Sequence, residues 1–283
     1  MNILSPRILV VEGNPPEANA RVVAYGCKPY GPAYADVMRA LDPSLECTVV
    51  RPCVDGAECL PAGSALGDFD GVVWSGSALN VYDRCPEIES QLQLADAILS
   101  HGLPVFGSCW GHQLVSTALG GKVHMNPRGR ELGAVGDITL TDAGAAHPMT
   151  AGRPKTYTVL EAHRDEVAEL PPGAVLLAGN ATSPVQAIAV ETGGVDFWGA
   201  QYHPEIDYAT IAAIMQRTHE ALLREGFFPS DAAYQEELAL VSQLDKPETT
   251  PPPGKYAAPE IRTVQARGLE LLNWLRAKVY KSI

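Results

Sequence analysis

The nine residues VFGSCWGHQ, at positions 105–113, place one cysteine between two glycines, directly after an apolar run and directly before a helical pattern. A side chain at the tip of a sharp strand-to-helix turn is crowded by its neighbours. Glycines two positions before and two positions after it let the backbone pass. The positive end of the helix that follows also favours a thiolate at Cys109. The stretch therefore predicts a nucleophile held at the edge of a sheet.

Strand and helix signals alternate along the chain before this point, as is typical of a parallel sheet with crossover helices. The predicted strands are short, apolar runs, and they are residues 7–13, 47–51, 69–74 and 103–106. Helical spacing of apolar residues predicts helices over 34–41, 88–99 and from Trp110 to Gly120. The connection from Asn14 to Pro32 is long, which is common in functional loops.

The pattern changes after Gly121, where short strands and turns replace the crossovers. Residues 133–141 and 156–160 are predicted to pair antiparallel, and the further strands are 174–178, 186–190 and 195–200. These segments predict an antiparallel edge on a mostly parallel sheet. An amphipathic pattern predicts one long helix over 208–225.

The chain after this helix has a linker composition. Residues 245–259 contain the run TTPPPG and are predicted to be a Pro-rich linker between a domain of residues 1–244 and a C-terminal helix within 260–283. That helix carries Leu271, Trp274 and Leu275, and we expect it to dock on the main domain or on a partner.

A second motif, QYHPE at positions 201–205, follows an apolar run and holds His203 and Glu205 two positions apart. A histidine oriented by a carboxylate is the usual base for a thiol nucleophile. Cys109, His203 and Glu205 are therefore predicted to form a catalytic triad.

Composition limits the class of protein. The 283 residues are 46% hydrophobic and 19% charged, which is typical of a globular chain with a sizeable core. The net charge of −12 argues against nucleic-acid or anionic-membrane partners. The chain shows no export signal and no apolar stretch long enough to span a membrane, so a cytoplasmic location is expected. The six cysteines form no C-x-x-C pair, and we expect reduced thiols, no metal site and no cofactor.

With these two motifs and AHRDEV at positions 162–167, the sequence resembles the class I glutamine amidotransferases. It is similar in particular to stand-alone proteins that resemble the amidotransferase domain of GMP synthetase, over residues 7–225. The resemblance implies an α/β fold, a flavodoxin-like three-layer sandwich with a mostly parallel sheet, and cleavage of a γ-glutamyl amide.

The resemblance also implies roles for individual residues. Cys109 would be the nucleophile, His203 the general base and acid, and Glu205 the group that orients His203. The N–H of Trp110 and the loop with Gly76 and Ser77 would bind the oxyanion, and Gln113 would touch the substrate. These seven residues are the predicted site; many relatives have two glycines where this chain has Gly76 and Ser77. The histidines at 112, 124, 147 and 163 are expected to be structural, with His163 supporting the sheet near the site.

Three functions remain open on the sequence. The first is a stand-alone hydrolase of glutamine or a γ-glutamyl amide, with residues 14–32 and 79–83 shaping its pocket. The second is a subunit that supplies ammonia to a separate synthetase, because the sequence has no G-x-x-x-x-G-K-[ST] loop and too few residues after 225 for an ATP-using domain. The third is a non-catalytic binding protein of the same fold. A homo-oligomer is also compatible with the sequence.

Overall fold

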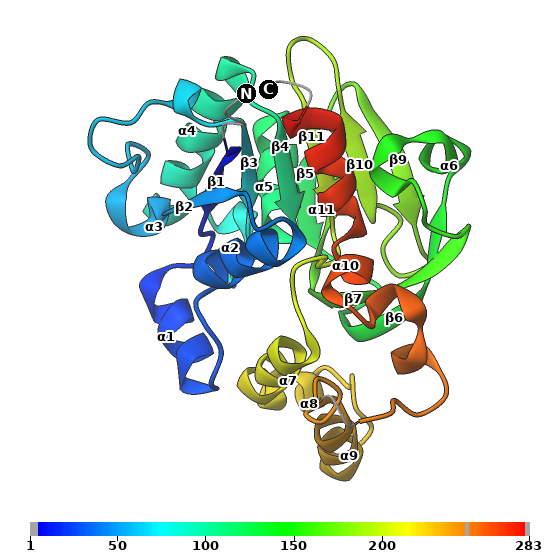
Figure 1. Cartoon of the computed structure of the whole chain (residues 1–283). Coiled ribbons are helices and arrows are strands. Elements are labelled where there is room, and N and C mark those ends of the chain that lie inside the picture. Colours follow the sequence, from blue (N-terminus) through cyan, green and yellow to red (C-terminus); the bar gives the residue numbers. More distant parts are fainter. Residues whose placement is uncertain (1–4, 247–248, 281–283) are drawn as a thin grey trace.

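The computed structural model describes residues 5–246 and 249–280, and within them the chain builds one nine-stranded sheet (Figure 1). Its strand order is β2-β1-β3-β4-β11-β10-β9-β6-β7. The strands are β1 (Arg7–Val11), β2 (Glu46–Val50), β3 (Gly71–Trp74), β4 (Val105–Ser108), β6 (Glu131–Leu140), β7 (Thr156–His163), β9 (Ala174–Gly179), β10 (Ala187–Val190) and β11 (Phe197–Ala200).

The half of the sheet from β2 to β11 is parallel, and the half from β11 to β7 is antiparallel. β1, β3 and β4 are apolar runs that are buried on both faces, as parallel strands between helical layers must be. The predicted pairing of β6 with β7 is confirmed. The predicted fold, a mostly parallel α/β sheet with an antiparallel edge, is therefore confirmed.

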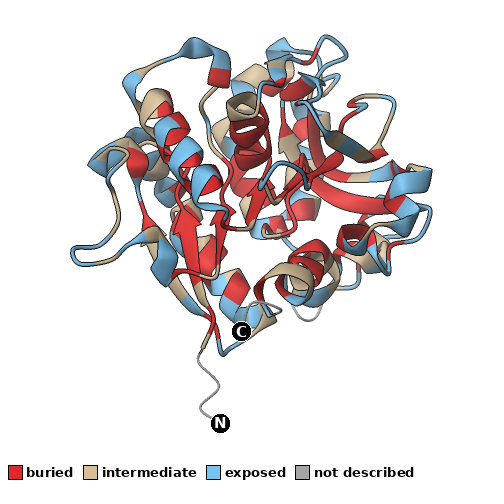
Figure 2. Ribbon diagram, turned by 90° about the horizontal axis from the view of Figure 1, so that it is seen from above, coloured by how far each residue is buried: buried red, intermediate tan, exposed pale blue. Residues whose placement is uncertain are grey.

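Helices cover both faces of the sheet and make three layers. Alternate residues of β1 point to opposite sides, so Ile8 and Val10 pack with α2 (Tyr30–Leu41), while Leu9 and Val11 lie in the cluster of α4 (Pro86–His101) and α5 (Trp110–Ala118). Figure 2 shows the buried residues concentrated in the strands and on the helix faces that meet them. The carboxyl ends of the parallel strands form the sheet edge at which α1 (Pro16–Ala24) and α7 (Tyr208–Arg217) lie (Figure 1).

Several elements differ from the sequence predictions. The helix predicted over 208–225 is two helices, α7 and α8 (His219–Arg224), which are separated at Thr218, where the backbone leaves the helical conformation with φ −107° and ψ 12°. A small separate sheet of β5 (Lys122–Met125) and β8 (Asp165–Glu169) was not predicted. The remaining helices, some of them short, are α3 (Pro52–Asp55), α6 (Asp142–Ala146), α9 (Asp231–Val241) and α10 (Val264–Arg267).

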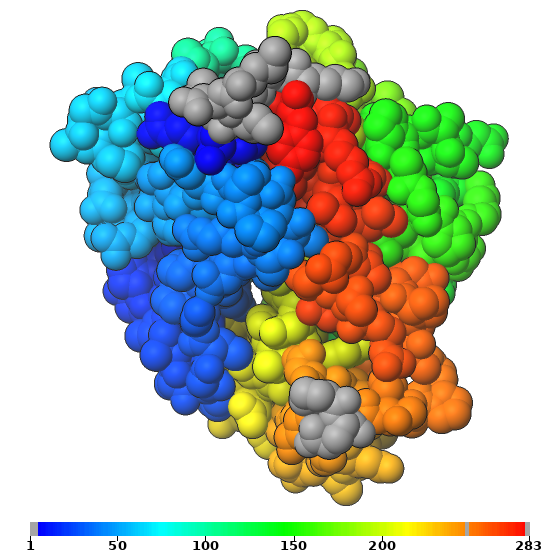
Figure 3. Space-filling model, viewed as in Figure 1, coloured from blue at the N-terminus to red at the C-terminus, as the bar shows by residue number. Residues whose placement is uncertain are grey.

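The C-terminal segment lies in the groove between α2 and the antiparallel half of the sheet, where Figure 3 shows it in red. It continues from α10 into α11 (Leu269–Trp274) and a π-helical turn (Leu275–Val279). Leu271, Trp274 and Leu275 are completely buried against the sheet. The helix predicted from residue 260 thus begins at Val264, residues 281–283 lie outside the described part, and the domain boundaries stay a prediction. Within residues 5–246 and 249–280, no helix combines the length and apolar character needed to cross a membrane.

Candidate active site

Cys109 occupies the turn between β4 and α5 with φ 47° and ψ −98°, a conformation that side chains other than glycine rarely adopt. Its backbone N–H donates to the carbonyl of Ala200 at 2.8 Å, which fixes the turn to the neighbouring strand β11. Such strain costs about 1–3 kcal/mol and persists where the surroundings determine it. The turn presents the thiol at the carboxyl edge of the sheet.

The two flanking glycines are required by close packing. A Cβ atom at Gly107 would lie 2.5 Å from the carbonyl carbon of Gly111, and one at Gly111 would lie 2.6 Å from the Cβ of Trp74. These contacts are with backbone or with the base of a side chain, so neither neighbour can move aside. The glycine pattern around Cys109 thus has the steric origin that the sequence suggested.

His203 and Glu205 follow β11, directly beside this turn. Nδ1 of His203 lies 2.7 Å from Oε1 of Glu205, and both side chains are buried. Nε2 of His203 is buried without a hydrogen-bond partner among the described residues. Burial lowers the pKa of His203, but the Glu205 carboxylate and the charge of Cys109 outweigh it and raise this pKa well above its usual value. The structure brings the three predicted triad residues together.

Replacing Glu205 by glutamine is expected to move the basic limb of the pH profile of kcat/KM toward lower pH. The Glu205 carboxylate raises the pKa of His203, so the imidazolium survives to higher pH in the wild type and loses its proton earlier in Glu205→Gln. We also expect the maximum to fall at least about tenfold. Steady-state rates between pH 5 and 10 measure both, and an unmoved basic limb would contradict the assigned role of Glu205.

The predicted oxyanion loop packs against the triad. A Cβ at Gly76 would lie 2.9 Å from Cε1 of His203, so the loop backbone touches the imidazole ring. The Ser75 hydroxyl accepts a hydrogen bond from the N–H of Gly13 at 2.9 Å and holds the loop to the end of β1. Ser77 lines the cleft beside Cys109, and the N–H of Trp110 belongs to the first turn of α5, where it has no intrahelical partner. Their oxyanion role stays a prediction.

Gly76→Ala is expected to lower kcat/KM at least about tenfold while the protein stays folded. The new methyl group would push His203 by a few tenths of an ångström, and small misplacements of a catalytic group are costly. Glutamate release measures the rate, and circular dichroism with thermal unfolding checks the fold. Gly67→Ala, the same substitution at an exposed glycine outside the cleft where the new methyl group makes no close contact, is the control. Full activity in Gly76→Ala would show that the loop does not constrain His203.

Gln113 lies in the cleft wall on α5, and its amide nitrogen is engaged on both sides. Nε2 donates to the carbonyl of Asp165 at 3.0 Å and to Oε1 of Gln201 at 3.1 Å. The side chain is 3% exposed, so it is held in one orientation. Its amide oxygen is the part that remains for the predicted substrate contact.

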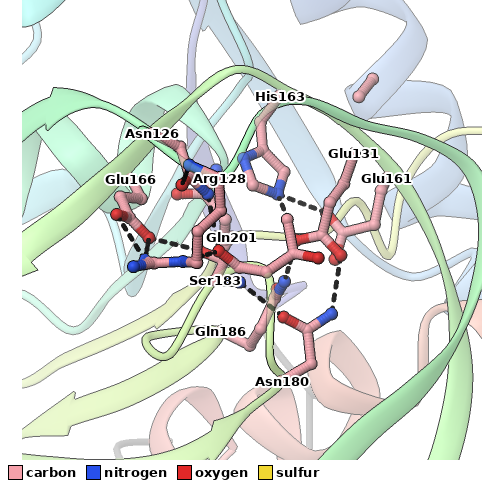
Figure 4. Close-up of polar contacts among 12 residues, drawn as sticks. Asn126, Arg128, Glu131, Glu161, His163, Glu166, Asn180, Ser183, Gln186 and Gln201 are labelled. Carbon is pink, nitrogen blue, oxygen red and sulfur yellow. Dashed lines mark hydrogen bonds and ion pairs between the residues drawn. The ribbon is translucent and has the colours of Figure 1, made fainter. Parts of the chain in front are cut away.

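A buried polar cluster supports this wall from behind (Figure 4). Nε2 of His163 lies 3.2 Å from Oε2 of Glu131 and 3.3 Å from Oε2 of Glu161, while its Nδ1 lies 2.9 Å from the carbonyl of Asp165. Because Asp165 also receives the bond from Gln113, the cluster positions the cleft wall, and the structure gives His163 the supporting place expected from the sequence.

The cluster has the composition of a metal site, since Glu131, Glu161 and His163 offer atoms within 4.8 Å of one another. Burial and the charge of Glu131 raise the pKa of Glu161 well above its usual value. Glu131 also accepts hydrogen bonds from Asn180 at 2.6 Å and Gln186 at 2.9 Å. The Glu131 carboxylate is thus held by hydrogen bonds, whereas both oxygens of Glu161 lack a hydrogen-bond partner among the described residues, and the absence of a metal or cofactor stays a prediction.

The other three histidines that were expected to be structural are buried or contact neighbouring residues away from the cleft. His112 is completely buried against Gly199, and burial lowers its pKa to about 3, so it is neutral. His124 lies 3.1 Å from Glu166, and Nδ1 of His147 accepts the N–H of Met149 at 3.1 Å. None of these three lines the cleft at Cys109.

Cys109 opens into a cleft of about 290 Å³. Leu79 and Asn80 form part of its wall, as do Ala18 and Arg21 of α1, so both segments expected to shape the pocket do so. Sequence reasoning missed that the wall is rich in arginine: it includes Arg21, Arg130, Arg164 and Arg217. These residues come from four separate segments, and no spacing in the sequence relates them.

The family model of the class-I glutamine amidotransferases matches residues 35–217 of the chain. Gamma-glutamyl-L-1-hydroxyisopropylamide hydrolase from a Pseudomonas species is 28% identical over 280 residues, which cover 95% of this chain and 92% of that protein. Glutamine-hydrolysing GMP synthase of Thermomicrobium roseum is 33% identical over 66% of this chain but only 32% of that protein. A glutamine-hydrolysing GMP synthase subunit of Thermococcus kodakarensis is 32% identical over 55% of this chain and 76% of its own length.

Solved structures share the fold. A glutamine amidotransferase of Thermotoga maritima superimposes with a TM-score of 0.64 at 17% identity, covering 95% of this chain and 98% of that one. A glutamine amidotransferase of Methylobacillus flagellatus gives a TM-score of 0.60 at 21% identity, with 99% of this chain and 96% of that one covered. At these identities the likeness concerns the fold alone.

Proposed function

Because the chain belongs to the class I glutamine amidotransferase family, a family of enzymes, we propose that it acts as a stand-alone hydrolase of γ-glutamyl amides. The observation that carries this proposal is the buried pair of His203 and Glu205 beside the strained turn that presents Cys109 to the cleft. The match along nearly the whole length of a γ-glutamyl amide hydrolase favours a hydrolase over a piece of a synthetase.

The geometry supports a thioester mechanism. The Cys109 sulfur adds to the γ-carbonyl carbon, and the N–H of Trp110 and the Gly76 loop receive the charge on the oxygen. The C–N bond then breaks while the imidazolium of His203 gives its proton to the departing nitrogen, which leaves a glutamyl thioester and a neutral imidazole. His203 next removes a proton from water, whose oxygen attacks the thioester. The products are glutamate and the Cys109 thiolate beside a protonated His203.

Glu205 acts through His203. Its carboxylate fixes the imidazole by the 2.7 Å contact at Nδ1, which leaves Nε2 for the proton transfers. It also stabilises the imidazolium that must be present when the amine departs. Each step therefore uses a group whose position the fold determines.

The alternative function is that of an ammonia-supplying subunit of a separate synthetase, and the similarity to the Thermococcus kodakarensis protein favours it. Its docking element would be the C-terminal helix. The structure instead buries Leu271, Trp274 and Leu275 of that helix against the protein's own sheet, so this apolar face is not available to a partner. The stand-alone hydrolase remains the better supported of the two.

The test is glutamate release by the purified protein from glutamine and from a panel of γ-glutamyl amides. The proposal expects kcat/KM for at least one γ-glutamyl amide to exceed that for glutamine at least about tenfold, which is about 1.4 kcal/mol in transition-state binding. Hydrolysis of glutamine alone, stimulated by a synthetase, would support the ammonia-supplying role. If Cys109 is reactive but no member of the panel is hydrolysed, a missing synthetase partner is indicated; if Cys109 is unreactive as well, the non-catalytic protein is favoured.

A further inference from the structure

The wall of the cleft is positively charged, whereas the chain as a whole is negatively charged. The chain carries a net charge of −12, yet four arginines line the cleft that contains Cys109. Arg21 is on α1 and Arg217 is the last residue of α7, two helices that contact each other at the carboxyl edge of the sheet (Figure 1). Arg130 directly precedes β6, and Arg164 joins β7 to β8.

Nearby carboxylates balance only part of this charge. Glu225 lies 3.1 Å from Arg130 and 3.5 Å from Arg164, so these two arginines share one partner. Asp165 is the carboxyl group in the cleft wall; it accepts the Tyr82 hydroxyl at 3.1 Å, and its burial raises its pKa. Four guanidinium groups thus face two carboxyl groups, one of them with a weakened tendency to ionise.

Arg21 and Arg217 have no carboxylate partner among the described residues. Nε of Arg21 donates to the main-chain carbonyl of Glu17 at 3.4 Å, on its own helix. Nη1 of Arg217 is buried and has no hydrogen-bond partner within the described part of the chain. No carboxylate of the described residues therefore neutralises either guanidinium, and an anionic group of a ligand in the cleft would supply that counter-charge.

The γ-glutamyl group does not account for this charge. It carries one ammonium and one carboxylate, and therefore adds no net charge to the cleft. The rest of a γ-glutamyl amide is the amine that departs. The single γ-glutamyl carboxylate is accompanied by an ammonium and leaves the excess positive charge of the cleft unchanged, so a second anion has to come from the amine part.

We propose that the amine released by this enzyme carries an anionic group, a carboxylate or a phosphoryl group, which Arg21 and Arg217 bind. This inference rests on the proposed function, because it names the substrate class of the same site. The substrates would be γ-glutamyl amino acids or their phosphorus-containing analogues, rather than amides of neutral amines or free glutamine.

The test compares two substrates that differ in one group. γ-Glutamyl-L-alanine carries a carboxylate where γ-glutamyl-L-1-hydroxyisopropylamide carries a hydroxymethyl group. We expect kcat/KM for the former to be at least about tenfold higher, as a charge-assisted hydrogen bond allows. In the double variant Arg21→Gln/Arg217→Gln the ratio should fall toward one. Arg39→Gln, which removes an exposed arginine of α2 outside the cleft, should keep both rates and their ratio.

The phosphonate analogue γ-glutamyl-1-aminoethylphosphonate separates the two anions, since the better substrate identifies the group that the arginines bind. Equal rates for the carboxylate and the neutral amide in the wild type would overturn the inference and leave the proposed function standing. So would an equal loss for both substrates in the double variant.

A binding measurement distinguishes failure of the proposed hydrolase function from failure of the inference about the anionic amine. Titration calorimetry with the Cys109→Ala variant measures Kd for the same pair of compounds without cleavage. If no amide is cleaved by the wild type, the proposed function fails, and calorimetry still decides the inference. Binding of γ-glutamyl-L-alanine at least about tenfold tighter than the neutral amide supports it, and equal affinity overturns it.

Discussion

Replacement of Cys109 by alanine is expected to lower kcat/KM for γ-glutamyl amides by at least about 10⁴-fold, because in the proposed mechanism the thiol of Cys109 forms the thioester. The turn that holds Cys109 depends on the close packing of Gly107 and Gly111. Both glycines remain in the variant, so it should fold normally. Glutamate release measures the rate. Acid-quenched wild-type protein should carry one glutamyl group by mass spectrometry, and Cys109→Ala should carry none.

The chain provides a matched control for the thiol. Cys59 is a free, half-buried cysteine outside the cleft, and Cys59→Ala should keep both the rate and the trapped glutamyl group. Residual activity of Cys109→Ala near the wild-type level, or a glutamyl group on another residue, would remove Cys109 from the mechanism. A loss of activity in Cys59→Ala would indicate a folding defect rather than a chemical one.

The placement of the three residues of the proposed triad was predictable because each part of the pattern is a local signal. Only glycine fits at positions 107 and 111. The strand end, the cysteine and the helix start all lie within nine consecutive residues, 105–113. His203 and Glu205 are two residues apart after a buried strand, so their contact needs no long-range information. The parallel sheet was likewise predictable from apolar runs such as residues 7–11, which must be buried on both faces.

The features that escaped prediction depend on residues far apart in the sequence. The short β5 pairs with β8, about 40 residues later, and its strand is mostly exposed, so it carries no buried apolar pattern. The break in the helix predicted over 208–225 is confined to one residue, Thr218, and interrupts a continuous amphipathic pattern. The cleft arginines are brought together by the fold alone, and the net charge of −12 gives no indication of a positively charged site.

The C-terminal segment is joined to the main body of the protein by a buried ion pair. Nε and Nη2 of Arg153 donate to the two carboxylate oxygens of Glu270 on α11, each at 2.7 Å, and both side chains are almost completely buried. The Tyr202 hydroxyl also donates to Glu270 at 2.9 Å. Because Tyr202 directly precedes His203, this network joins the last helix to the segment that holds the proposed general base.

Glu270→Gln is therefore expected to reduce the free energy of unfolding by about 3–5 kcal/mol, because it leaves the guanidinium of Arg153 buried without a counter-charge. Urea denaturation followed by fluorescence measures the change.

Glu169→Gln, which breaks the exposed pair with Lys122, is the control and should change stability by less than about 1 kcal/mol. Replacing both partners, as Arg153→Met/Glu270→Leu, should recover much of the loss, since no unpaired charge then remains. A loss in Glu270→Gln as small as in the control would mean that water or another group compensates Arg153. The last helix would then be held by its apolar face alone, through Leu271, Trp274 and Leu275.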